Sequence, residues 1–117
     1  MTKQRNDEHS TEFGIWLRKQ KDIDSSLGFV TTNIDYFWKN YKTNQYMLIE
    51  EKRYMARVAR FQHYILQQLH DAFKSDKNYH GMHLLQFEHT DPEDGRIYLD
   101  QKEITKKQLM DFLSFKD

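Results

Sequence analysis

Two acids and a lysine stand where two apolar segments of the chain would meet. In residues 33–54, NIDYFWKNYKTNQYMLIEEKRY, Asp35 opens the first apolar segment, and Glu50 and Lys52 close the second. The polar residues 42–45, KTNQ, are typical of the turn of a β-hairpin. Because the start of one strand of a hairpin lies beside the end of the other, the sequence predicts that Asp35 lies near Glu50 and Lys52.

These residue types together could hydrolyse a phosphodiester bond. Two neighbouring carboxylates repel each other, and a divalent cation that prefers oxygen ligands, such as Mg²⁺ or Mn²⁺, relieves the repulsion. A bound cation lowers the pKa of its water and stabilises charge on a phosphoryl oxygen, and Lys52 would assist the attacking water or neutralise the developing charge. Glu50 and Lys52 share a face because side chains alternate along a strand, whereas the face of Asp35 depends on the strand register.

The same residues also have a purely structural explanation. Hairpins often end in charged residues, and a lysine two positions after a glutamate is common on protein surfaces. The acids and Lys52 would then form a surface salt bridge, and the chain would be a protein–protein interaction domain. We favour the catalytic interpretation because the pair ends an apolar strand, follows a strand that begins with aspartate and precedes a helix.

The surrounding sequence predicts an α/β fold with a single mixed sheet flanked by helices. Residues 1–10 are polar and are expected to be a flexible arm, and residues 11–117 are expected to form one domain. Apolar spacing predicts helices over residues 11–24, 56–74 and 106–115. Alternating or β-branched segments predict strands over residues 28–33, 34–41, 46–54, 82–89 and 96–104, the last two forming an antiparallel hairpin.

Composition narrows the classes of function. The chain has 117 residues, with 18 basic and 18 acidic side chains and a net charge of +0, so bulk charge would not bind it to a polyanion. It has no cysteine, which excludes disulfides and thiolate metal sites. Four glycines form no phosphate-binding loop, so no nucleotide cofactor is expected. No membrane span or signal-peptide core is recognised, so we expect a cytoplasmic protein without a membrane partner.

The segment from Asp35 through IEEKR to FQHYILQQL resembles the core of the PD-(D/E)XK nuclease superfamily. In that core an acid opens one strand and (D/E)-x-K closes the next. Within the superfamily the pattern is most similar to the small VRR-NUC and Holliday-junction-resolvase-like nucleases. The resemblance covers roughly residues 10–73, with Ile34 where the pattern has proline. It implies a restriction-endonuclease-like core of the order α-β-β-β-α-β, here with an extra hairpin strand and a C-terminal helix.

The resemblance also implies roles for single residues. Asp35 and Glu50 would bind Mg²⁺ or Mn²⁺, the backbone carbonyl of Glu51 would add a third ligand, and Lys52 would be the catalytic lysine.

Two further residues match family positions outside the hairpin. Glu12 would bind the metal directly or through water, and Gln62 would orient the lysine or touch the phosphate. Gln62 is the stronger candidate, since an acid in the first turn of a helix is favoured there in any case.

Basic side chains near the predicted site would contact DNA phosphates, which position a substrate without reading its sequence. A solvated helix face explains the arginines among them equally well. The arginines fall at helical spacing if the helix begins early. The candidates are Arg53, Arg57, Arg60, Lys39 and Lys42.

The sequence therefore favours a metal-dependent nuclease, a DNA endonuclease of phage or prokaryotic type. A homodimer is expected by analogy, since a minimal nuclease often needs a second copy to cut two strands. The alternatives are a non-catalytic nucleic-acid-binding module on the same scaffold and the interaction domain described above.

Overall fold

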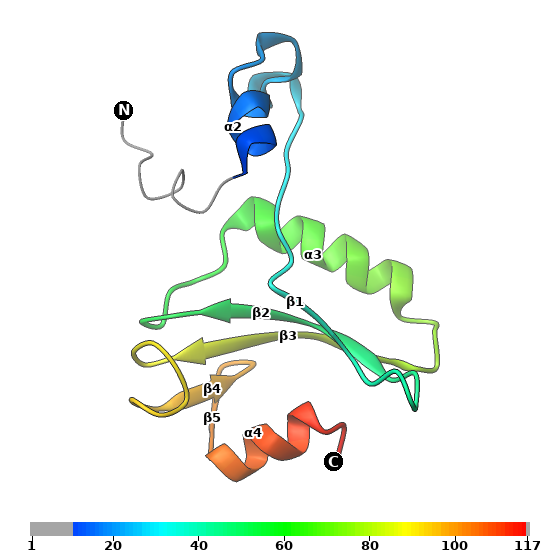
Figure 1. Ribbon diagram of the computed structural model, residues 1–117, viewed down its shortest axis with the longest axis vertical. Coiled ribbons are helices and arrows are strands. Elements are labelled where there is room, and N and C mark those ends of the chain that lie inside the picture. Colours follow the sequence, from blue (N-terminus) through cyan, green and yellow to red (C-terminus); the bar gives the residue numbers. More distant parts are fainter. Residues whose placement is uncertain (1–10, 117) are drawn as a thin grey trace. The chain divides into compact units, whose positions relative to one another are not determined.

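The computed structural model describes residues 11–116, and the chain divides into two compact units, residues 1–32 and 33–117 (Figure 1). The predicted arm over residues 1–10 lies outside the described residues. The expectation of a single domain over residues 11–117 stays a prediction. No helix of the described part is long and apolar enough to cross a membrane.

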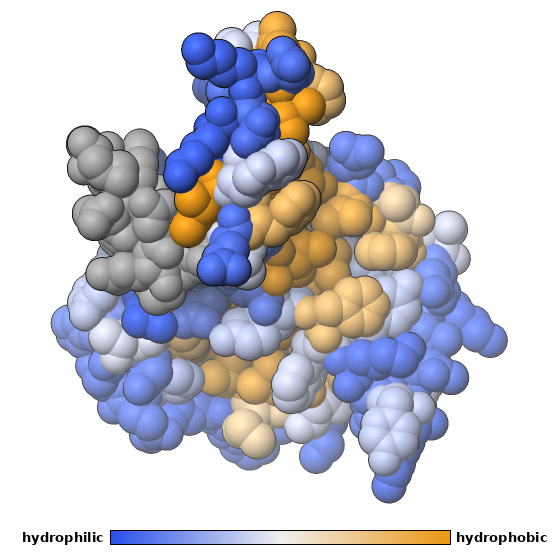
Figure 2. Space-filling model, turned by 45° about the horizontal axis from the view of Figure 1, so that its top comes forward, coloured by the Kyte–Doolittle hydropathy of each residue, from blue (hydrophilic) through white to orange (hydrophobic). Residues whose placement is uncertain are grey.

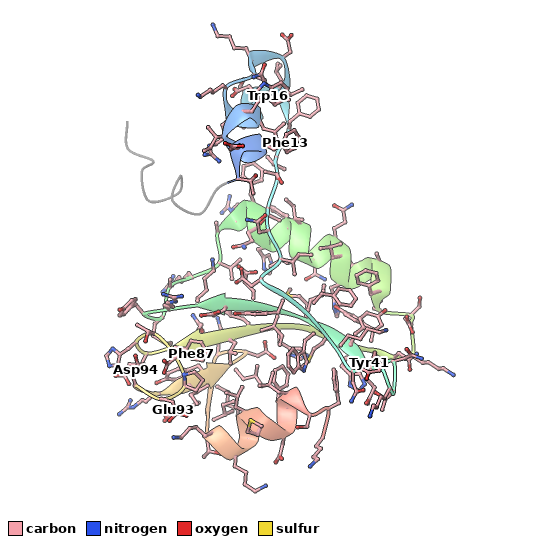
Figure 3. All side chains as sticks on the ribbon, viewed as in Figure 1. Phe13, Trp16, Tyr41, Phe87, Glu93 and Asp94 are labelled. Atoms are coloured by element: carbon pink, nitrogen blue, oxygen red, sulfur yellow. The ribbon has the colours of Figure 1, made fainter. Side chains whose placement is uncertain are left out.

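The first unit consists of short helical segments. Helix α2 (Glu12–Arg18) begins at Thr11, whose side chain accepts a hydrogen bond from the Gly14 backbone nitrogen at 3.1 Å. Two 3₁₀ turns follow, η1 (Lys21–Ile23) and η2 (Ser25–Leu27). None of these elements contains a buried residue. The exposed rings of Phe13 and Trp16 stack on each other (Figure 3). Figure 2 shows hydrophobic residues at the surface of the molecule among hydrophilic ones.

The predicted strand over residues 28–33 is wrong. Gly28 has a φ of 101° and ends η2, and the residues after it pair with no strand. β-Branched and aromatic residues favour strands only where a neighbouring strand and a packed face receive them, and Phe29 and Val30 remain exposed.

The second unit is built on a mixed five-stranded sheet, which confirms the predicted α/β class. The sheet order is β1-β2-β3-β4-β5, with β2 and β3 parallel and every other pair antiparallel. Helix α3 makes the crossover that a parallel pair requires. The elements are β1 (Tyr36–Lys39), β2 (Tyr46–Lys52), α3 (Arg60–Phe73), β3 (Tyr79–Phe87), β4 (Ile97–Leu99), β5 (Lys102–Ile104) and α4 (Lys106–Leu113).

The two faces of the sheet are covered by different helices. Figure 1 shows α3 on one face and α4 on the other. Alternation along β2 sends Met47 and Ile49 into a cluster with Leu109 of α4. It sends Leu48 to the opposite face, where Leu66 of α3 is also almost fully buried. Glu50 therefore lies on the α3 face.

Strand β1 is an edge strand, and all four of its residues are exposed. The predicted hairpin of β1 and β2 is confirmed, with Asn44 in the left-handed conformation at its turn, φ 68°. The indole nitrogen of Trp38 donates a hydrogen bond of 2.7 Å to the Leu113 carbonyl at the end of α4, so the edge strand is joined to α4 as well as to β2.

At two of the boundaries that differ from the prediction, residues other than glycine adopt left-handed conformations. The predicted strand over residues 96–104 is two strands, divided at Asp100 and Gln101, with φ 50° and 71°; two such residues in succession make a tight hairpin turn. The helix expected from residue 56 begins at Arg60, after Tyr54 and Met55, with φ 54° and 57°.

A histidine joins β3 to the turn between β4 and β5. The Nδ1 of His83 lies 2.8 Å from Asp100 Oδ2, and its Nε2 lies 2.8 Å from the His80 carbonyl oxygen. Both partners are acceptors, so both ring nitrogens donate, which requires the charged imidazolium. Burial lowers the pKa of His83, but the hydrogen bonds to Asp100 and the His80 carbonyl raise it, and the net pKa lies above the usual 6.5.

The stability of the fold is expected to fall in the pH range where His83 loses its proton. A raised folded-state pKa means that the stabilisation is fully present below pH 6.5 and is lost as the pH rises through the folded-state pKa. We expect a loss of about 1 kcal/mol. Urea unfolding of the wild type and His83→Gln between pH 6 and 9 measures it. If the free energy of unfolding changes with pH equally in the two proteins, the His83–Asp100 pair does not contain a charged imidazolium.

Candidate functional site

Asp35 and Glu50 face each other across the β1–β2 hairpin. The register pairs Tyr36 with Ile49, and one further step places Asp35 opposite Glu50. Directly opposed residues of antiparallel strands point to the same face. The register, which the sequence left open, therefore puts both carboxylates on the α3 face. The Oδ2 of Asp35 accepts a hydrogen bond of 2.8 Å from the Glu51 backbone nitrogen, which fixes Asp35 at the end of β2.

Glu50 is the buried centre of the site. Only 2% of the surface of Glu50 is exposed to solvent. Its Oε2 accepts a hydrogen bond of 2.5 Å from Gln62 Nε2 and lies 3.5 Å from Lys52 Nζ. Lys52 Nζ in turn donates to Gln62 Oε1 at 3.2 Å. The three side chains form a closed ring around one carboxylate oxygen, whereas Oε1 of Glu50 is buried and has no hydrogen-bond partner.

The surroundings oppose the charge on Glu50. Burial raises the pKa of Glu50, and the Asp35 carboxylate raises it further, while Lys52 and Gln62 lower it. The net pKa lies above the usual 4.5. A buried carboxylate beside a second one is unfavourable unless a cation or hydrogen-bond donors compensate it. Lys52 and Gln62 supply that compensation to one oxygen only.

The sequence positions Lys52 and Gln62 by strand alternation and by the start of α3. Lys52 shares the face of Glu50, two residues earlier in β2. After Lys52 the chain remains hydrogen-bonded to the end of β3 and the residues that follow it. The backbone nitrogen of Tyr54 donates to the His89 carbonyl at 2.9 Å, and that of Met55 donates to the Phe87 carbonyl at 3.0 Å.

Gln62 stands in the first turn of α3. The helix begins after Ala59, which provides no side-chain cap, so its first backbone N–H groups have no capping side chain. Such a helix end favours negative charge nearby. Gln62 therefore meets Glu50 where the helix also favours a carboxylate.

Glu51 and Arg53 pair with each other. The side chain of Glu51 accepts from the Tyr36 hydroxyl at 3.0 Å and lies 3.6 Å from Arg53 Nε. The role predicted for Glu51 concerns its backbone carbonyl and stays a prediction.

The three basic candidates after β2 do not share a helix. The sequence put Arg53, Arg57 and Arg60 at helical spacing only if the helix began early, and α3 begins at Arg60, so that condition is not met. The left-handed Tyr54 and Met55 lie between Arg53 and Arg57, so no helix joins these two arginines. Arg57 instead borders the cavity beside Glu50.

The remaining candidates lie away from Glu50 or in the other unit. Lys39 and Lys42 are at the turn end of the β1–β2 hairpin, opposite to the end that carries Asp35. Lys39 Nζ lies 5.3 Å from the centre of the Tyr46 ring. Glu12 is an exposed residue of α2 in the first unit, and its role as a metal ligand stays a prediction.

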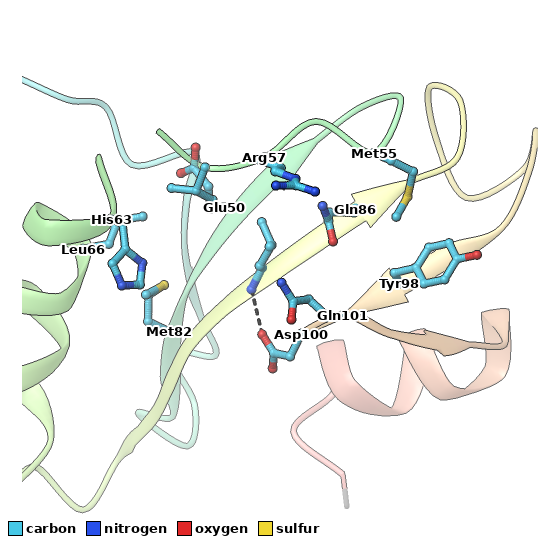
Figure 4. Close-up of a pocket in the computed structure, with 12 residues that line it drawn as sticks. Glu50, Met55, Arg57, His63, Leu66, Met82, Gln86, Tyr98, Asp100 and Gln101 are labelled. Atoms are coloured by element: carbon cyan, nitrogen blue, oxygen red, sulfur yellow. Dashed lines mark hydrogen bonds between the residues drawn. The ribbon is translucent and has the colours of Figure 1, made fainter. Parts of the chain in front are cut away.

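A cavity of about 970 Å³ opens beside Glu50 on the α3 face of the sheet (Figure 4). Sequence reasoning missed most of its lining. The one signal was Gln86, an amide within the apolar segment MHLLQFEH. The lining residues are Glu50, Met55, Arg57, Val58, His63, Leu66, Met82, Leu84, Gln86, Tyr98, Asp100 and Gln101.

The candidate metal ligands at the site are two side-chain carboxylates, those of Asp35 and Glu50. Among residues 11–116 there is no group of three or more His, Cys, Asp or Glu side chains that could hold a metal ion. A cation here would therefore have Asp35 and Glu50 as its side-chain ligands and would retain water, which is the usual coordination of Mg²⁺ in proteins.

Comparison with known proteins adds no relative: no family model, no curated protein and no solved structure matches the chain.

Proposed function

We propose that the chain is a metal-dependent nuclease that hydrolyses phosphodiester bonds in DNA. The observation that carries the proposal is the environment of Glu50, a buried carboxylate with one unpartnered oxygen, beside Asp35 and bonded to Lys52 and Gln62. A salt bridge made only for stability would not leave a buried oxygen without a partner next to a second carboxylate.

Asp35 and Glu50 would hold Mg²⁺ or Mn²⁺, with the Glu51 carbonyl as a further ligand. Oε1 of Glu50 has no hydrogen-bond partner, and the pKa of Glu50 is raised. Both indicate that a positive charge beside Glu50 would stabilise its ionised form, so the residues fit such a cation. When bound, the cation would supply an activated water and stabilise charge on the phosphate.

The remaining residues have distinct tasks in the proposed reaction. Lys52 presents a positive charge beside the carboxylates, where it would offset the negative charge that develops on the phosphate. Gln62 holds the ammonium of Lys52 through its Oε1 and the carboxylate of Glu50 through its Nε2, so it acts as a positioning residue.

The topology supports the resemblance to PD-(D/E)XK nucleases in part. The order β1, β2, α3, β3, with a hairpin followed by a parallel crossover, agrees with the last part of the α-β-β-β-α-β core. Among residues 11–116, the first of its three consecutive strands has no counterpart. The proposal therefore also includes a restriction-endonuclease-like fold, endonuclease action, a homodimer and a cytoplasmic location.

The test is cleavage of a supercoiled plasmid and of single-stranded, duplex and branched oligonucleotides with Mg²⁺, Mn²⁺ or EDTA. We expect cutting with either cation and none with EDTA. Binding without cutting under every condition would favour the non-catalytic module. If the protein shows no cutting and no salt-dependent binding, the interaction domain is favoured.

A further inference from the structure

We propose that the cavity beside Glu50 binds an unpaired nucleotide of the substrate, so that the enzyme acts on single-stranded or locally opened DNA. The inference rests on the proposed nuclease function and specifies its substrate class. It depends on where the cavity lies, on its unpartnered polar atoms and on its charge.

Glu50 lines the cavity, and the predicted catalytic lysine lies beside Glu50, with its Nζ 3.5 Å from Glu50 Oε2. Lys52 pairs with Gln86 across β2 and β3, and Gln86 pairs with Tyr98 across β3 and β4. Paired residues of neighbouring strands lie side by side on one face, so Lys52, Gln86 and Tyr98 form a row. Two strand spacings, roughly 10 Å, separate the ends of this row. A nucleotide whose phosphate lies at Lys52 would direct its base along the row.

Gln86 provides hydrogen-bonding groups within this row. The residue is 6% exposed, and its Nε2 donates to the Ala56 carbonyl at 3.0 Å. That bond fixes the orientation of the amide and leaves its Oε1 and the second N–H without a partner among residues 11–116. An acceptor and a donor side by side match the edge of a nucleobase.

Tyr98 provides the aromatic surface. Figure 4 shows its ring at one end of the cavity, with Met55 above it. Stacking on an aromatic ring holds any unpaired base, because every base has a π face. Bases within a duplex are already stacked on each other and do not offer that face.

The charge of the lining favours a base over a duplex backbone. Among the described lining residues, Arg57 is the only lysine or arginine, whereas Glu50 and Asp100 are acidic. Phosphates of a duplex laid along the cavity would meet these acids, and the net charge of +0 supplies no compensating attraction. Arg57 has no ion-pair partner in the described part of the chain and can take the single phosphate of the bound nucleotide.

The test is binding of fluorescein-labelled DNA in EDTA, so that cleavage does not enter. The probes are a single strand of about 12 nucleotides and the blunt duplex of the same sequence. We expect the single strand to bind at least about tenfold more tightly than the duplex. Tyr98→Leu, which keeps apolar bulk but removes the ring, is expected to weaken single-strand binding by about tenfold.

Tyr64→Leu is the matched control, because Tyr64 is exposed on α3 and does not line the cavity. We expect it to bind like the wild type. Arg57→Gln is the second variant, and it is expected to weaken single-strand binding and to reduce its dependence on salt. Thermal melting of each variant checks that its fold is retained.

Two results would overturn the inference: equal affinity for the two probes, or single-strand binding by folded Tyr98→Leu and Arg57→Gln that equals that of the wild type. Metal-dependent cleavage together with either result would reject the cavity as the nucleotide site and leave the nuclease function standing. Single-strand binding that requires Tyr98, without cleavage under any metal, would reject the nuclease function and keep the binding site.

Discussion

Lys52→Met lowers the rate of DNA cleavage by about 100- to 1,000-fold, according to the proposed mechanism. The Nζ of Lys52 lies 3.5 Å from Glu50 Oε2 and 3.2 Å from Gln62 Oε1, so it places a positive charge beside the buried carboxylate. Methionine retains an unbranched apolar side chain, so packing along the stem changes little. The loss therefore reports the charge and its hydrogen bonds.

The measurement is the single-turnover cleavage rate with Mg²⁺ and an excess of enzyme, which excludes product release. Lys102→Met is the control, because Lys102 is an exposed lysine of β5 in the same unit, outside the cavity. We expect its rate to equal that of the wild type. A folded Lys52→Met protein that cleaves at the wild-type rate would remove Lys52 from the mechanism.

Glu50→Gln is expected to abolish cleavage and, at the same time, to stabilise the fold. The substitution removes a buried charge from beside Asp35. A glutamine at this position still accepts hydrogen bonds from Lys52 and Gln62, and its amide can donate to the Asp35 carboxylate. We expect the free energy of unfolding to rise by about 1–2 kcal/mol at pH 8, a gain typical when an active-site requirement is removed.

The stabilisation by Glu50→Gln depends on pH in a defined direction. Burial and the Asp35 carboxylate raise the pKa of Glu50, so between its usual value of 4.5 and the folded-state pKa the folded protein binds more protons than the unfolded one. Wild-type stability therefore falls as the pH rises through that interval. The variant lacks this slope, so its advantage is small at pH 4.5 and complete above the folded-state pKa.

Denaturant unfolding between pH 4 and 8 tests the expectation, with Glu103→Gln on the exposed strand β5 as the control. Mg²⁺ should raise the melting temperature of the wild type by mass action and leave that of Glu50→Gln unchanged. A less stable Glu50→Gln protein at pH 8 would mean that the ionised carboxylate is a net stabilising group without a metal.

The sequence predicted the parts of the site that depend on local patterns. The turn residues and flanking apolar segments predicted the hairpin, which is confirmed. Alternation along β2 put Glu50 and Lys52 on one face. Gln62 was placed by family resemblance alone, and the structure brings it to both of them.

Features that depend on tertiary contacts could not be predicted in this way. The register of Asp35 against Glu50 follows from pairing along the whole hairpin. The cavity is lined by residues of β2, α3, β3, β4 and the segments that follow β2 and β4, and nothing local encodes the row of Lys52, Gln86 and Tyr98.

Local propensity also misled in two places. Residues 28–33 have strand-forming side chains but no neighbouring strand. Apolar spacing predicted a helix from residue 56, but α3 begins only at Arg60, after the left-handed Tyr54 and Met55.

The position of β1 at the sheet edge has a consequence for heat inactivation. One member of the carboxylate pair, Asp35, belongs to a segment with a single neighbouring strand, while Glu50 belongs to the interior strand β2. Edge segments open with a smaller free energy than the core. Opening β1 would remove Asp35 and leave Glu50, Lys52 and Gln62 in place. The proposed nuclease activity would therefore be lost at a lower temperature than the one at which the core melts, and it would recover fully on cooling.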